Sequence, residues 1–181
     1  MTVTSTTATS YDIVIVGAGS AGIATASSLL KRNGSLRVAL VDPSSDHYYQ
    51  PGWTMVGGGV FEPESTHRKT VDLIPAGVDW IAQSATGFAP DDNSVSLDND
   101  TSLIYGHLVV APGLKLDWNA VEGLEETLGK NGVTSNYRYD LAPYTWQLVQ
   151  GLNNGKALFT QPPMPIKCAG APQKALYLSA S

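Results

Sequence analysis

The stretch Tyr11-Asp-Ile-Val-Ile-Val-Gly-Ala-Gly-Ser-Ala-Gly22 decides the fold of this chain. Residues 13–16 form an almost wholly apolar run, which is typical of a parallel strand covered on both faces. Glycines follow at 17, 19 and 22, and residues 23–31 have good helical composition. This order predicts a strand, a tight turn and a helix.

Each glycine of the turn has its own expected role in binding a dinucleotide. Gly17 permits the tight turn, Gly19 lets a pyrophosphate approach the backbone, and Gly22 lets the helix pack closely on the strand. The free N–H groups at the start of the helix then face the negative charge. Glycine-rich turns are common, so an ordinary β–turn–α unit is the alternative.

The next apolar run supplies context for the glycine motif. Residues 38–41 end in Asp42, twenty residues after Gly22. A carboxylate at that place accepts hydrogen bonds from the ribose hydroxyls of an adenine dinucleotide. The combination therefore favours a dinucleotide site.

Composition limits the remaining function classes. The chain has 181 residues, with 43% hydrophobic and 15% charged residues, which indicates a globular protein of one domain or one domain and part of another. A net charge of −5 argues against nucleic acid as a partner. No apolar run is long enough to span a bilayer. Residues 1–10 lack the features of a secretory signal, and we expect a disordered tail there.

A series of short β-runs follows in the middle of the chain. We expect strands over residues 78–88, 94–97 and 103–111, which form a three-stranded antiparallel meander with turns between them. The last run leads into Leu108-Val-Val-Ala-Pro-Gly113. In two-dinucleotide flavoproteins a strand of this kind closes the cofactor's sheet, with its terminal glycine against the flavin nucleotide. Ala111 and Gly113 are therefore candidate cofactor contacts, and the order favours FAD over NAD.

The loop over residues 42–54 carries Tyr48, Tyr49 and Trp53. These aromatic side chains could cover a flat cofactor ring or anchor the loop on the core, and composition does not separate the two. His47 has no second histidine nearby at ligand spacing, so we expect no metal site. Residues 57–59, three glycines, are expected to form a flexible joint.

The last third of the chain resembles the start of a second dinucleotide fold. Residues 116–136 are expected to cross into it, residues 141–152 to form a helix, residues 156–160 a strand and residues 175–179 a helical segment. The loop before that segment lacks the glycine motif. We therefore expect an FAD-binding domain over residues 11–115 and the truncated beginning of a second Rossmann-like domain over residues 116–181. The expected fold class is α/β.

Cys168 is the only cysteine, and it lies between Lys167 and Lys174, shortly before Pro172. A helix N-terminus and adjacent cations favour a reactive thiolate. A lone cysteine is also commonly a small buried apolar residue. The expected position of its loop, facing the flavin, favours a catalytic role.

Two stretches, Lys167-Cys-Ala-Gly-Ala-Pro-Gln-Lys-Ala-Leu-Tyr-Leu-Ser179 and His47-Tyr-Tyr-Gln-Pro-Gly-Trp-Thr-Met-Val-Gly57, resemble sulfide:quinone oxidoreductases, in the branch that includes the mitochondrial enzymes. The resemblance implies two Rossmann-like domains and an enzyme that oxidises sulfide. Two electrons pass through FAD to a quinone, and the sulfane sulfur passes to an acceptor such as glutathione, sulfite or sulfide.

The same resemblance implies roles for particular residues. Ser20 and Ala21 would contact the FAD diphosphate, Asp42 the ribose, Gln50 the vicinity of the cofactor, and Ala85 the adenine through its backbone. Asp42 stands where family members often have Glu, and both accept the same hydrogen bonds. Cys168 matches the first of two redox cysteines.

The second cysteine, the quinone pocket and the membrane-associating region would all lie beyond residue 181, so we expect this chain alone to be inactive. The expected location is peripheral membrane, on the cytoplasmic face if the source is bacterial and otherwise on the mitochondrial inner membrane. Two other functions stay open. A pyridine-nucleotide flavin oxidoreductase, such as a type II NADH dehydrogenase, would need a glycine loop where Cys168 lies. A truncated nucleotide-binding module would have no catalysis.

Overall fold

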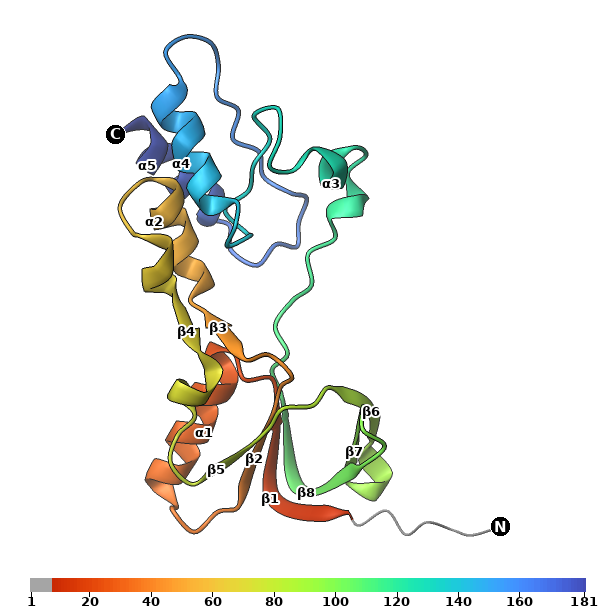
Figure 1. The fold of residues 1–181 in the computed structure, drawn as a ribbon. Helices are drawn as coiled ribbons and strands as arrows, with labels where there is room; N and C mark the ends of the chain where they lie inside the picture. Colours follow the sequence, from red (N-terminus) through yellow and green to blue (C-terminus); the bar gives the residue numbers. More distant parts are fainter. Residues whose placement is uncertain (1–7) are drawn as a thin grey trace. The chain divides into compact units, whose positions relative to one another are not determined.

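The computed structural model describes residues 8–181, and the chain forms two compact units (Figure 1). The first unit holds the chain up to His47 together with Arg68–Lys115, and the second holds Tyr48–His67 together with Leu116–Ser181. Most of the expected tail, residues 1–7, lies outside the described residues. The first strand, β1, spans Thr9–Val16 and so begins before the expected domain start at residue 11.

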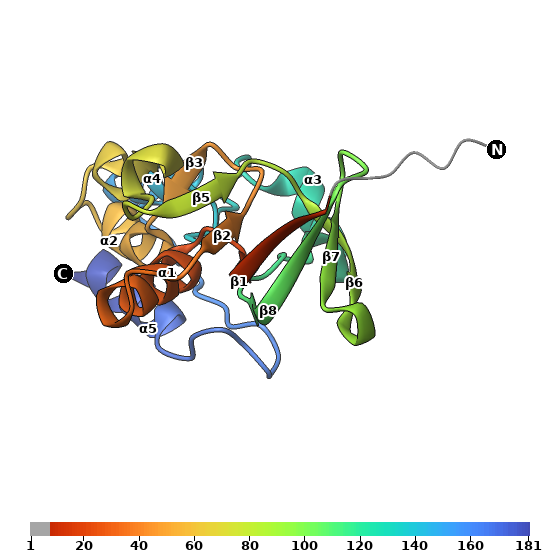
Figure 2. The ribbon, with the colours of Figure 1, turned by 90° about the horizontal axis from the view of Figure 1, so that it is seen from below.

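A six-stranded mixed sheet with the order β5-β2-β1-β8-β7-β6 forms the first unit. Strands β5, β2, β1 and β8 run parallel, and β8, β7 and β6 form an antiparallel meander (Figures 1 and 2). The elements besides β1 are α1 (Ser20–Arg32), β2 (Val38–Val41), β5 (Val78–Ile81), β6 (Ala85–Ala89), β7 (Ser94–Leu97) and β8 (Ser102–Val110). The expected Rossmann-like α/β class with a meander is confirmed.

Burial explains why β1 and β2 are apolar on both sides. Ile13, Ile15 and Leu40 belong to a core cluster that packs with α1 on one face of the sheet. Val14 and Val41 belong to a second cluster that includes residues of the meander. A strand with strands on both sides and cores on both faces has no polar position in its centre.

The expected single strand over residues 78–88 is wrong, because the structure divides it into β5 and β6. Strand β5 pairs parallel with β2, whereas β6 pairs antiparallel with β7. The chain turns between them, where Gln83 N–H donates to Ile81 O and Ser84 N–H donates to the Asp98 carboxylate. The meander therefore consists of β6, β7 and β8.

Short elements connect the main ones. Strands β3 (Asp46–Tyr48) and β4 (His67–Lys69) form a two-stranded sheet. The 3-10 helices are η1 (Gln50–Gly52), η2 (Pro63–Thr66), η3 (Thr70–Leu73), η4 (Pro90–Asp92) and η5 (Trp118–Ala120).

The second unit is helical within the described residues, with α2 (Trp53–Gly57), α3 (Leu124–Thr127), α4 (Ala142–Gly151) and α5 (Ala171–Ala180). Helix α4 confirms the helix expected over residues 141–152, and α5 begins before the expected residue 175. Helix α2 contacts both α4 and α5. Gly57 ends α2 against the Asn136 side chain and Gly59 packs on Trp146, so the expected flexible joint is a packed helix end.

The expected strand over residues 156–160 is wrong, because these residues join no sheet. Leu158 is 84% exposed, so the segment buries little apolar surface. A strand needs a neighbour to satisfy its backbone N–H and C=O groups, and residues 156–160 have none. The two expected helical segments are present as α4 and α5, and the second Rossmann-like domain stays a prediction.

Among residues 8–181, no helix is both long and apolar enough to cross a bilayer.

Replacing Leu40 by Ala should lower the free energy of unfolding by about 2–5 kcal/mol, because the side chain is fully buried between the sheet and α1. Leu114→Ala is the matched control in the same unit, since Leu114 is 61% exposed. Its effect should stay within about 0.5 kcal/mol. Urea unfolding followed by circular dichroism measures both, and equal effects would contradict the described core.

Candidate dinucleotide-binding site

The glycine turn after β1 is closed by the backbone of β8 and of the strand β2. Gly17 has a φ of +107°, in the region that favours glycine, and its N–H donates to Val41 O at 2.8 Å. A Cβ on Gly17 would overlap the carbonyl oxygen of Ala111. Ala111 N–H in turn donates to Val16 O at 2.8 Å. The turn and the end of β8 therefore lie against each other, and the expected contact of Ala111 with the cofactor stays a prediction.

Gly22 and Gly19 differ sharply in their surroundings. A Cβ on Gly22 would overlap the Gly17 carbonyl oxygen, so α1 approaches the turn only because this side chain is absent. A Cβ on Gly19 would meet no heavy atom within 4 Å. Gly22 therefore serves the packing of the helix, and Gly19 leaves open space beside the turn.

The N-terminus of α1 opens onto this space. The N-cap residue is Gly19, no side chain caps the helix, and no acidic residue lies in its first turn. Ser20 and Ala21 are exposed. The first N–H groups of a helix have no intrahelical acceptor, and the helix dipole adds positive potential there. This end of α1 is suited to hold an anion such as a pyrophosphate.

Asp42 directly follows β2, and its carboxylate is half-buried beside the turn. Ala18 N–H donates to Oδ2 at 2.7 Å, and Ser44 N–H donates to Oδ1 at 2.9 Å. A carboxylate oxygen has two acceptor sites, so each oxygen can still accept a ribose hydroxyl. The sequence motif gave no signal for the bond between Asp42 and Ala18, because these residues lie far apart along the chain.

Two further expected contacts lie at strand ends of the same unit. Gly113 follows β8 with a φ of +77°, and a Cβ there would meet no heavy atom within 4 Å. Ala85 begins β6, partly buried against the core cluster that contains Val41. The expected contact of Ala85 with adenine stays a prediction.

Gln50 and Cys168 belong to the second unit. Gln50 begins η1, and its Oε1 accepts a hydrogen bond from Lys167 Nζ, the neighbour of Cys168 in sequence. Lys167 Nζ also lies 5.9 Å from the centre of the Tyr137 ring. The Cys168 side chain is a partly buried free thiol. The backbone carbonyl oxygen of Cys168 accepts a hydrogen bond from Ala171 N–H at the start of α5. The structure thus brings the Gln50 segment to the cysteine loop, which the sequence did not show.

The same surroundings change the pKa of the Tyr137 side chain. Burial, and secondarily the charge of Cys168, raises the pKa of the Tyr137 phenol above its ordinary value.

The aromatic residues of the loop over residues 42–54 have different environments. Trp53 is only 9% exposed and packs with Val56 and Ala142, so it anchors its segment on the core of the second unit. Tyr48 stacks on His67 with ring centres 5.0 Å apart. Tyr49 is exposed. For Trp53, the anchoring alternative therefore holds.

Comparison with known proteins adds evidence from outside the chain. A sequence profile described as "Pyridine nucleotide-disulphide oxidoreductase" matches residues 11–147. A mitochondrial sulfide:quinone oxidoreductase of Dictyostelium discoideum is 46% identical over 170 residues, which cover 92% of this chain and 37% of that protein. The mouse mitochondrial sulfide:quinone oxidoreductase is 41% identical, over 93% of this chain and 38% of that protein.

Among solved structures, the sulfide:quinone oxidoreductase of Aquifex aeolicus matches with a TM-score of 0.62 and 25% identity. The match covers 80% of this chain and 32% of that one. The chain therefore spans less than two fifths of the length of the two curated relatives.

Replacing Gly22 by Ala should destabilise the first unit by about 1–3 kcal/mol, because the new Cβ overlaps a backbone oxygen that cannot move independently. The matched control is Gly151→Ala at the end of α4, where a Cβ meets nothing within 4 Å. Urea unfolding of both variants measures the difference. A Gly22→Ala variant as stable as the control would show that α1 does not approach the turn this closely.

Proposed function

Because the chain belongs to the pyridine nucleotide-disulphide oxidoreductase family and is homologous to mitochondrial-type sulfide:quinone oxidoreductases, we propose that its first unit binds FAD at the turn after β1. The observation that carries the proposal is the uncapped N-terminus of α1 behind the open position Gly19. An FAD diphosphate has the charge and the shape that this end accepts.

The described residues fit FAD in distinct ways. The N–H groups of Gly19, Ser20 and Ala21 would hold the diphosphate, and the Asp42 carboxylate would accept the ribose hydroxyls. Gly17 and Gly22 shape the turn. The remaining proposed contacts are Ala85 at the adenine, Ala111 and Gly113 at the flavin nucleotide, and Gln50 near the cofactor. When bound, FAD supplies two-electron redox chemistry that no side chain provides.

We propose further that the whole protein oxidises sulfide and that Cys168 carries the sulfur. Sulfide attacks a disulfide or polysulfide bridge between the Cys168 sulfur and a second cysteine of the whole protein, and a new S–S bond forms as an S–S bond of the bridge breaks. The products are a protein-bound persulfide and a protein thiolate. When the sulfane sulfur passes to a small acceptor such as glutathione, sulfite or sulfide, two protein thiolates remain. Their two electrons go to a quinone as the bridge re-forms.

The proposed quinone substrate implies a membrane partner. Quinones that carry long apolar tails reside in the bilayer, so the whole protein would contact a membrane peripherally. The names of the relatives contain the word mitochondrial, which favours a mitochondrial membrane, for which we propose the inner one; the cytoplasmic face of a bacterial membrane is the alternative.

A second candidate function is electron transfer from NADH or NADPH, which the description of the matched family favours. The loop around Cys168 lacks a glycine motif for a second dinucleotide phosphate. Sulfide is therefore the preferred electron donor.

Replacing Gly19 by Ala should weaken FAD binding at least about tenfold, since a methyl group enters the space proposed for the diphosphate. The free energy of unfolding without ligand should stay within about 0.5 kcal/mol of that of the original chain. Quenching of flavin fluorescence measures the affinity, and urea unfolding measures the stability. Unchanged FAD affinity would contradict the proposed site.

The role of Cys168 can be tested in a chimaera in which this chain replaces the matching part of the Dictyostelium relative. The chimaera should reduce a quinone with sulfide, and Cys168→Ser should lower that rate at least about a hundredfold while FAD stays bound. Met164→Leu, in the same loop, is the control and should leave the rate unchanged. Full activity of Cys168→Ser would refute the sulfur-carrying role, and reduction by NADH alone would favour the second candidate.

A further inference from the structure

We propose that His47 is a positioning residue of the dinucleotide-binding turn: it holds the carbonyl oxygen of Ala18 while Asp42 holds the N–H of Ala18, so that the peptide groups before and after Ala18 are both fixed. This inference rests on the proposed function, because the ligand it serves is the diphosphate of FAD.

The geometry places Ala18 between two side chains from one segment. Ala18 N–H donates to Asp42 Oδ2 at 2.7 Å, and His47 Nδ1 lies 3.3 Å from Ala18 O. Ala18 itself is buried, at the top of the core beneath the turn. Both anchors therefore act on the middle residue of the glycine turn.

The planarity of the peptide bond turns these anchors into orientation. In a trans peptide the C=O and the following N–H point in opposite directions. Holding Ala18 O at His47 therefore directs the Gly19 N–H away from His47. Holding Ala18 N–H at Asp42 likewise directs the Gly17 carbonyl oxygen away from Asp42, and this oxygen is the one that lies against Gly22. The turn is thus set before any diphosphate arrives.

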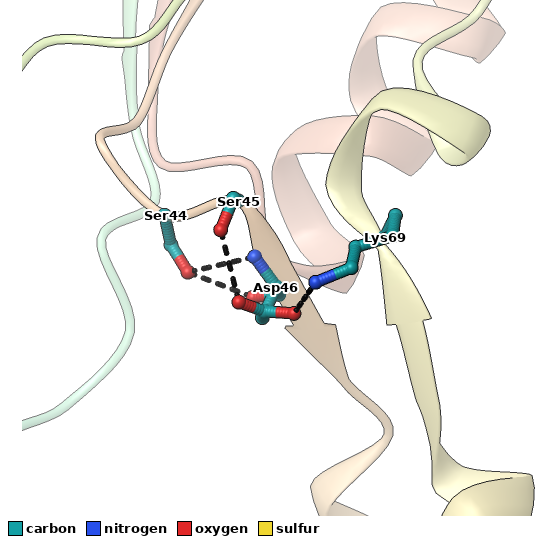
Figure 3. Close-up of polar contacts among 4 residues, drawn as sticks. All are labelled: Ser44, Ser45, Asp46 and Lys69. Atoms are coloured by element: carbon teal, nitrogen blue, oxygen red, sulfur yellow. Dashed lines mark hydrogen bonds and ion pairs between the residues drawn. The ribbon is translucent and has the colours of Figure 1, made fainter.

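A polar network holds the segment just before His47, with Asp46 at its centre (Figure 3). Lys69 Nζ donates to Asp46 Oδ1 at 2.7 Å, and Ser45 Oγ donates to Asp46 Oδ2 at 2.9 Å. Ser44 Oγ donates to Asp46 O at 2.8 Å. Thr70 N–H donates to Ser45 O at 2.9 Å, which ties the segment to η3. Asp46, the residue before His47, is therefore fixed through both its side chain and its backbone carbonyl.

The hydrogen bond also specifies what the side chain must supply. A carbonyl oxygen can only accept, so Nδ1 must carry the proton, in the neutral Nδ1–H tautomer or in the imidazolium. The Nδ2 group of an Asn side chain reaches a similar place and also donates. Phe fills similar space and donates nothing.

The test compares His47→Asn and His47→Phe in the 181-residue chain, with His107→Phe on β8 as the matched control. The readout without ligand is the hydrogen-exchange protection of the Ala18 amide. The readout with ligand is the dissociation constant for ADP, which carries the ribose and diphosphate without the flavin. We expect His47→Phe to lower both protection and ADP affinity about tenfold. His47→Asn should stay within about twofold of the original chain, and His107→Phe should change neither.

Two outcomes overturn the inference: full Ala18 protection in His47→Phe, or a loss in His47→Asn as large as that in His47→Phe. The second would mean that imidazole packing, and not donation to Ala18, holds the turn. If the original chain binds neither ADP nor FAD, the proposed function fails. The protection of Ala18 in the three variants then still decides the role of His47.

Discussion

The contact between the carbonyl oxygen of Gly17 and the backbone of Gly22 is the constraint on which the rest of the site depends. It lets α1 begin directly above the turn, so that its first N–H groups reach the surface beside Gly19. A side chain at Gly22 would push the helix away and remove the positive helix end from the turn. One missing Cβ therefore connects the packing of the first unit to its capacity for an anion.

Segments distant in sequence meet around that contact because parallel strands end at the same edge of their sheet. Asp42 directly follows β2, Ala111 directly follows β8, and the glycine turn directly follows β1. The second unit contains other reactive and polar groups. Cys168 lies near the start of α5, and its neighbour Lys167 donates a hydrogen bond to Gln50. Each unit thus contains, within itself, the residues proposed for a different part of the reaction: the first for binding a nucleotide and the second for carrying sulfur.

Local pattern explains why individual elements of both units could be predicted. Strand β2 spans the predicted residues 38–41, and α4 nearly matches the predicted residues 141–152, because side-chain periodicity depends only on near neighbours. The glycine turn was equally visible, since the tight turn at Gly17 and the close helix packing at Gly22 follow from spacing. The sequence pattern gave wrong predictions where a neighbouring strand decides whether a segment joins a sheet. The expected single strand over residues 78–88 is two strands that pair with different partners, and residues 156–160 have no strand beside them.

The sequence by itself determined the strand–turn–helix, the last two strands of the meander and the carboxylate at the end of β2, because each depends on residue types at short spacing. Only the tertiary structure decided how these parts meet. The bonds that join Ala18 to Asp42 and to His47 cross 24 and 29 residues. The packing of Trp53 against Ala142 spans a still longer stretch of chain. Such pairs are set by the close approach of whole elements, and no short pattern in the chain encodes that approach.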